Sequence, residues 1–170
     1  MSRVYDYVGP QEIRQRTAQN RSGHRVATHR DLDDWLRVSG QEADAGGLIR
    51  LTFIVDEEGI LWVADRRFEH VACAGGRPVL AAGEIALRSH GGHWVVQETS
   101  NQSTGYCPEP DCWPALASAL DAAAIPRPQG FSDEFSFRKC PACGERNIVK
   151  DGWFVCAICG ADLPFQWNFA

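Results

Sequence analysis

Residues 140–160 read CPACGERNIVKDGWFVCAICG, and this stretch decides the architecture of the C-terminal part of the chain. It holds two Cys-x2-Cys pairs, Cys140 with Cys143 and Cys156 with Cys159, which are separated by twelve residues. Two intervening residues allow one tight turn to present both thiolates to one ion, and zinc prefers four ligands at tetrahedral corners. A glycine follows each pair and permits the positive φ that such a turn needs. The pattern predicts one structural zinc ion (Zn2+) bound by these four cysteines.

The residues between the pairs predict a hairpin, because the turn dipeptide Asp151-Gly152 lies between two strand-like runs, 148–150 and 153–155. The sequences Cys-Pro-Ala-Cys-Gly and Cys-Ala-Ile-Cys-Gly resemble the paired knuckles of zinc ribbons and rubredoxin-like proteins, which implies a C-terminal zinc ribbon. Iron in the same cage, a redox dithiol and a catalytic zinc are the alternatives. A catalytic zinc keeps an open coordination position, and a single redox pair needs no matched partner. Structural zinc is therefore favoured, while iron stays an open alternative.

Composition narrows the class of protein. The chain has 170 residues, a net charge of −5 and seven cysteines, an odd number that argues against a disulfide framework. No apolar run is long enough for a transmembrane helix, and residues 1–10 lack a signal pattern. We therefore expect a cytoplasmic protein that is not bound to a membrane. The acidic charge, without a basic stripe, makes nucleic acid an unexpected partner.

The remaining pattern indicates an α+β protein with a zinc ribbon at its C-terminus. Pro126 to Gly130 reads as a linker and divides the chain into a main domain, 1–130, and the ribbon, 131–170. Thr28 and Asp31 form a capping-box-like pair before a helix. The predicted fold is a small antiparallel sheet, or a partly closed barrel, with two or three helices. The ribbon is expected to dock on it through its aromatic residues, which are Trp153, Phe154, Phe165, Trp167 and Phe169.

Two central stretches stand out. Residues 70–84 read HVACAGGRPVLAAGE, and residues 100–108 read SNQSTGYCP. Over residues 70–125 this pattern resembles the conserved C-terminal domain of plant IQ-motif calmodulin-binding proteins and related bacterial effector and toxin-like domains. The matching positions are His70, Gly76, Gly83, Glu84, Asn101, Ser103, Tyr106 and Pro108.

The chain departs from that pattern at two places. Thr104-Gly105 stands where the family has Gly-His, and Cys107 stands where it has a basic residue. Chemistry that depends on the family's His is therefore not expected here. Calmodulin binding is not implied either, because no basic amphipathic helix precedes the segment.

The same two stretches supply the candidate ligand-binding residues of the main domain. We expect His70, Glu84, Asn101, Ser103 and Tyr106 to converge on one concave surface, because loops rich in small polar residues often carry binding groups. The alternative is that these side chains only cap turns. The leading hypothesis is a zinc-binding protein whose main domain recognises a small ligand or a peptide, with no catalytic residue assigned. One alternative is an enzyme that uses His70, Glu84 and Tyr106 as acid–base groups. The other is a nucleic-acid-binding zinc-ribbon protein.

Overall fold

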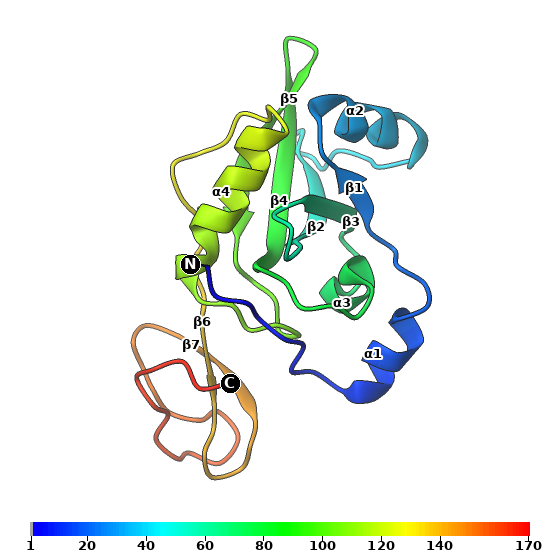
Figure 1. The fold of residues 1–170 in the computed structure, drawn as a ribbon. Helices are drawn as coiled ribbons and strands as arrows, with labels where there is room; N and C mark the ends of the chain where they lie inside the picture. Colours follow the sequence, from blue (N-terminus) through cyan, green and yellow to red (C-terminus); the bar gives the residue numbers. More distant parts are fainter. Residues whose placement is uncertain (1) are drawn as a thin grey trace.

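The computed structural model describes residues 2–170 and confirms the α+β class. Five antiparallel strands form an open sheet in the order β1-β3-β2-β4-β5, and β6 and β7 form a separate two-stranded sheet (Figure 1). The strands are β1 (His24–Val26), β2 (Ile49–Val55), β3 (Leu61–Asp65), β4 (Ala81–His90), β5 (His93–Ser100), β6 (Ser136–Lys139) and β7 (Arg146–Val149). The helices are α1 (Gln11–Thr17), α2 (His29–Val38), α3 (His70–Ala74) and α4 (Trp113–Ala122), and the 3-10 turn η1 (Pro110–Cys112) precedes α4.

The antiparallel sheet is confirmed and stays open, so of the two predicted alternatives the sheet is found and the partly closed barrel is not. One detail differs, because the described residues form four α-helices instead of two or three. The additional short helix is α3, which spans five residues and ends at Gly75 with a φ of 64°. A single turn of this length carries no helical periodicity that a sequence could reveal.

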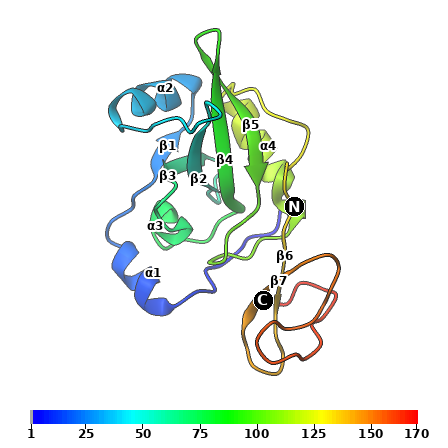
Figure 2. The same cartoon turned by 180° about the vertical axis from the view of Figure 1, so that it is seen from behind.

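The centre of the molecule is β2, because its side chains are covered on both faces of the sheet. Phe53 and Ile54 point to opposite faces, and both are fully buried. Both α3 and α4 pack against this part of the sheet. In Figure 1, α4 lies in front of the sheet, and the reverse view in Figure 2 places it behind β5, so α4 covers one face. A strand that is buried on both faces reads as a nearly continuous apolar run, as residues 49–55 do.

Helix α2 begins as its sequence predicts. The Thr28 hydroxyl accepts a hydrogen bond from the backbone N–H of Asp31 at 3.2 Å. The Asp31 carboxylate in turn accepts the N–H of Thr28 at 2.8 Å, so the capping box is complete. No helix among residues 2–170 is both long and apolar enough to cross a membrane.

The segment between α4 and β6 runs along the outer edge of β5. The Val96 N–H donates to the Pro126 carbonyl at 2.9 Å, and the Ser132 N–H donates to the Thr99 carbonyl at 2.8 Å. The Thr99 N–H donates to the Ser132 hydroxyl at 3.1 Å. The segment that reads as a linker in the sequence therefore covers the last strand of the sheet.

The C-terminal hairpin also forms as its sequence predicts. Asp151 and Gly152 have φ values of 52° and 69°, and the flanking Lys150 and Trp153 form an antiparallel bridge. Two successive residues with positive φ define the turn that matches the twist of a two-residue hairpin. This turn brings the second cysteine pair back beside the first.

Candidate metal centre

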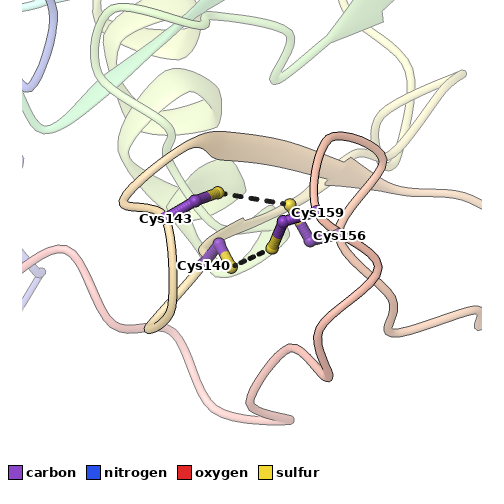
Figure 3. A group of neighbouring side chains, drawn as sticks. All are labelled: Cys140, Cys143, Cys156 and Cys159. Atoms are coloured by element: carbon purple, nitrogen blue, oxygen red, sulfur yellow. Dashed lines mark hydrogen bonds between the residues drawn. The ribbon is translucent and has the colours of Figure 1, made fainter.

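The four paired cysteines gather at one point. The Sγ atoms of Cys140 and Cys159 are 3.6 Å apart, and those of Cys143 and Cys156 are 3.7 Å apart (Figure 3). All four sulfurs lie within 4.8 Å of one another. A tetrahedron with metal–sulfur bonds of about 2.3 Å places its sulfurs about 3.8 Å apart. The spacing is much longer than a disulfide bond of about 2.05 Å. The four thiolates are therefore positioned to bind one metal ion.

Two glycine turns hold the sulfurs in this arrangement. Gly144 has a φ of 78°, and its N–H donates to the Cys140 carbonyl at 2.9 Å. Gly160 repeats the geometry with a φ of 77° and a 3.0 Å bond to the Cys156 carbonyl. A side chain at either position would strain the left-handed backbone. The two glycines therefore close the turns as the sequence predicted.

The surroundings of Cys140 and Cys156 favour thiolates. The backbone N–H of Cys159, together with that of Ile158 and the Asn147 side-chain amide, lowers the pKa of Cys156 to about 6. The Ile158 N–H lies 3.4 Å from the Cys156 sulfur, and the Asn147 amide nitrogen lies 3.5 Å from it. The backbone N–H of Cys143 likewise lowers the pKa of Cys140. Hydrogen bonds from amides to sulfur are typical of thiolates that bind metals.

Asn147 is a residue of the centre that the sequence analysis missed. Besides its contact with Cys156, its side-chain oxygen accepts the Ala157 N–H at 2.9 Å. It is buried with 6% of its surface exposed. The one signal in the sequence is a polar amide beside the apolar pair Ile148-Val149 in a hairpin strand. Asn147 connects β7 to the second cysteine turn and so supports both.

The ribbon docks on the main domain through fewer aromatic residues than predicted. Trp153 is 71% exposed and Phe165 is 79% exposed, so the expectation that these two rings dock is wrong. Phe165 instead packs on Phe154 within the ribbon, with ring centroids 4.8 Å apart. Trp167 does reach the main domain, because its indole N–H donates to the Cys107 carbonyl at 2.7 Å and its ring meets Tyr5.

Arg138 joins the ribbon to the main domain through one buried ion pair, and no local sequence pattern predicts it. It lies on β6, and its side chain is only 6% exposed. It donates to the Glu109 carboxylate at 2.7 Å. The same guanidinium donates to the carbonyls of Phe137, Pro164 and Phe165. One cation therefore joins the loop before α4, strand β6 and the C-terminal segment.

Three of the five predicted ligand-binding residues are buried and bonded to backbone. The Asn101 amide donates to the carbonyls of Pro108 and Phe135 at 2.8 and 2.7 Å, and its oxygen accepts the Phe135 N–H at 2.8 Å. The Ser103 hydroxyl accepts the Tyr106 N–H at 3.4 Å. The Tyr106 hydroxyl donates to the Arg77 carbonyl at 2.6 Å. These contacts fix the loop between β5 and α4 and attach β6 to it.

The other two residues lie in different surroundings. The His70 Nε2 contacts the Gly83 carbonyl at 2.9 Å, so this nitrogen carries the proton, because a carbonyl can only accept. Glu84 is exposed on β4 and borders a shallow pocket with Arg50 and Glu98. The two sequence stretches, 70–84 and 100–108, meet at Gly83, since a Cβ there would lie 1.9 Å from the Ser100 carbonyl oxygen. A ligand-binding role for the five residues stays a prediction.

His70 and Tyr106 are poorly suited to acid–base chemistry. Burial lowers the pKa of His70 to about 4 and raises the pKa of Tyr106 well above its ordinary value. Both protons are held by backbone carbonyls, at Gly83 and Arg77. A general acid or base needs a pKa near the working pH and access to a substrate. The arrangement favours a structural role for both side chains over a catalytic one.

Comparison with protein-family models, with curated proteins and with solved structures gives no match for this chain. The resemblance of residues 70–125 to the plant IQ-motif proteins and the bacterial effector-like domains therefore gains no support from them. The zinc-ribbon resemblance is compatible with the cysteine cluster.

Proposed function

We propose that the protein binds one structural zinc ion and that its main domain recognises a small ligand or a peptide. The observation that carries the metal assignment is the four-sulfur cluster, with all Sγ atoms within 4.8 Å. Four thiolates suit zinc and fill its coordination sphere, which leaves no open position for catalysis. We assign residues 131–170 to the zinc ribbon and residues 1–130 to the main domain.

The metal has a stabilising role because the ribbon has little core of its own. Its buried cluster consists of Cys140, Cys156 and Leu163, with Val149, Phe154 and Ala161 packed against it. A unit of about 40 residues cannot bury enough apolar surface to fold without a disulfide, a metal or a partner. Zinc binding contributes folding free energy in such units.

The same metal supports the main domain through the loop between β5 and α4. The ribbon holds that loop through Asn101, Cys107 and Glu109, which contact Phe135, Trp167 and Arg138 respectively. The loop also contains Tyr106, whose hydroxyl holds the Arg77 backbone on the far side of the domain. We infer that zinc keeps the recognition surface of the main domain in its folded geometry.

The metal assignment is tested by elemental analysis of the purified protein and of a Cys140→Ser/Cys156→Ser double variant. We expect one zinc per chain in the parent and none in the variant, with faster hydrogen exchange over residues 136–165 and over the Asn101–Pro108 loop. Cys73→Ala is the matched control, because Cys73 is buried outside the cluster. Zinc that persists in the double variant contradicts the assignment to these cysteines. Iron in place of zinc in the parent protein keeps the four-cysteine site but identifies the metal as the alternative, iron.

The recognition role is tested by a thermal-shift screen with metabolite and peptide pools. A ligand that binds only the folded state raises the melting temperature, by an amount that grows with the ratio of its concentration to its Kd. We expect at least one pool to stabilise the zinc-loaded protein. Failure of every pool contradicts a recognition module for small ligands or peptides.

A further inference from the structure

A cavity lies on the face of the five-stranded sheet that carries Trp62, away from the cysteine cluster. Its floor is one row of side chains across three strands, because Arg25 on β1 pairs with Trp62 on β3, and Trp62 pairs with Ile54 on β2. Directly opposed residues of an antiparallel pair lie on the same face. Arg21 and Arg77 also border the cavity, whose volume is about 160 Å³. This space can hold a molecule of a few non-hydrogen atoms.

Arg21 is fixed in place before any ligand arrives. Its guanidinium carbon lies 3.2 Å from the centre of the Trp62 ring, and its Nε donates to the Cys73 carbonyl at 3.0 Å. Gly75, with a φ of 64°, lies against the aliphatic part of the same side chain. A planar guanidinium stacked on an aromatic ring keeps its outer N–H groups free for a planar or tetrahedral anion.

The three arginines have no carboxylate partner among residues 2–170. The ion pairs of the described residues include neither Arg21 nor Arg25 nor Arg77. Burial lowers the pKa of Arg21, and the charge of Arg77 acts in the same direction, while nearby Asp56 opposes it. An anion placed between the guanidinium groups of Arg21 and Arg77 would relieve their repulsion.

The acidic residues at the cavity do not occupy this position. Asp56 directs one carboxylate oxygen to the N–H groups of Glu58 and Ile60 and the other to the Trp62 indole at 2.7 Å. Glu57 and Glu58 are exposed on the turn that borders the opening. Their charge repels a long polyanion such as a nucleic acid strand, which has to lie across the whole opening.

We infer that this cavity binds the oxyanion of a small molecule, a carboxylate or a phosphate, between Arg21, Arg25 and Arg77. The inference rests on the proposed recognition role and names the ligand class and the site. Charge-assisted bonds from guanidinium groups to carboxylate or phosphate oxygens supply the affinity, and the stacked Trp62 ring supplies the orientation. The ligand is therefore a small anionic metabolite.

Tyr106 acts as a positioning residue for this site. Its hydroxyl bonds the Arg77 carbonyl at 2.6 Å, so it fixes the backbone from which the Arg77 side chain enters the cavity. The ribbon holds the loop that carries Tyr106. This chain of contacts connects the zinc centre to the arginine cavity, and it gives Tyr106 a role in recognition without contact to the ligand.

The test is titration of the zinc-loaded protein with inorganic phosphate and, separately, with succinate. Binding is measured by calorimetry and by the shift of the NMR signal of the Trp62 indole N–H. We expect at least one anion to bind with a Kd of about 1 mM or tighter, the range expected for a few charge-assisted bonds. Arg77→Gln should weaken it about tenfold or more, the effect of losing one such bond. Tyr106→Phe should weaken it less, and Arg16→Gln, a change at an exposed arginine on α1, should have no effect.

The two anions distinguish a phosphate ligand from a carboxylate ligand. The inference is overturned if neither anion shifts the Trp62 signal at about 10 mM, a concentration that detects millimolar affinity. It is equally overturned if Arg77→Gln binds as tightly as the parent. If the pool screen then yields a ligand whose binding survives Arg77→Gln, recognition stands and the arginine site fails. If the anions and all the pools fail together, both proposals are lost.

Discussion

Replacing Arg138 with methionine tests how the ribbon is attached to the main domain. Methionine has a similar length and fills the apolar part of the space, but it donates no hydrogen bond. Arg138→Met therefore removes the 2.7 Å ion pair to Glu109 and the bonds to the carbonyls of Phe137, Pro164 and Phe165. The Glu109 carboxylate, only 19% exposed, is left without its partner.

The expected cost follows from this geometry. Removal of one partner from a buried ion pair costs about 3–5 kcal/mol, and the residual exposure of Glu109 places this pair near the lower limit, about 3 kcal/mol. Glu109→Gln keeps an acceptor oxygen and loses only the charge, so it should cost about 1–2 kcal/mol. Arg37→Met is the control, because the Arg37–Asp33 pair has an arginine that is 71% exposed. Such surface pairs contribute about 1 kcal/mol or less.

Urea unfolding of zinc-loaded protein, followed by tryptophan fluorescence, measures these differences in the free energy of unfolding. The double variant Arg138→Met/Glu109→Gln should lose less than the sum of the single losses, because both changes break the same contact. The reasoning is refuted if Arg138→Met costs no more than Arg37→Met, or if the two changes at the pair are additive.

Three further predictions concern other parts of the chain. Burial holds the pKa of His70 near 4, below the 6.5 of an unfolded histidine. The contribution of His70 to the free energy of unfolding is therefore fully present above pH 6.5 and is lost as the pH falls to 4, by at most about 3 kcal/mol. His70→Gln should flatten this pH dependence in urea titrations at several pH values. Gly83→Ala places a Cβ 1.9 Å from the Ser100 carbonyl oxygen and should cost at least about 3 kcal/mol, whereas Gly130→Ala, which meets nothing within 4 Å, should be nearly neutral in the same assay. With a net charge of −5, submicromolar protein should not shift mixed DNA or RNA on a gel at about 150 mM salt, and a clear shift would contradict the expected absence of nucleic-acid binding.

The features that were predictable from the sequence are local ones. The cysteine spacing, the Thr28–Asp31 capping box and the Asp151-Gly152 turn each depend on residues that are neighbours in the chain. In every case the side chains alone specify the geometry, because one tight turn or one helical turn brings them together. These patterns therefore appear in the structure where they were expected.

The features that escaped prediction depend on partners far away in the chain. The sequence shows that residues 101–106 are polar, and polar groups are buried only when they are paired. It does not show that Phe135 and Arg77 supply those partners. The arginine cavity is hidden for the same reason, since its lining comes from residues 21 to 78 on several elements. Arg138 likewise gives no local sign of its contact with Glu109, 29 positions earlier.

The segment between α4 and β6, which runs along the outer edge of β5, has a consequence for the behaviour of the metal-free protein. An uncovered edge strand offers a row of free N–H and C=O groups to any other chain, and it is a common starting point for self-association. Here the segment from Pro126 to Ser132 occupies the N–H groups of Val96 and Thr99 and the carbonyl of Thr99. Its far end is held where Asn101 bonds Phe135 just before β6. If the proposed zinc ion is bound there, its loss would loosen that attachment and free the edge. The metal then acts as a safeguard of solubility, and chelation should produce oligomers that grow with protein concentration through pairing at β5.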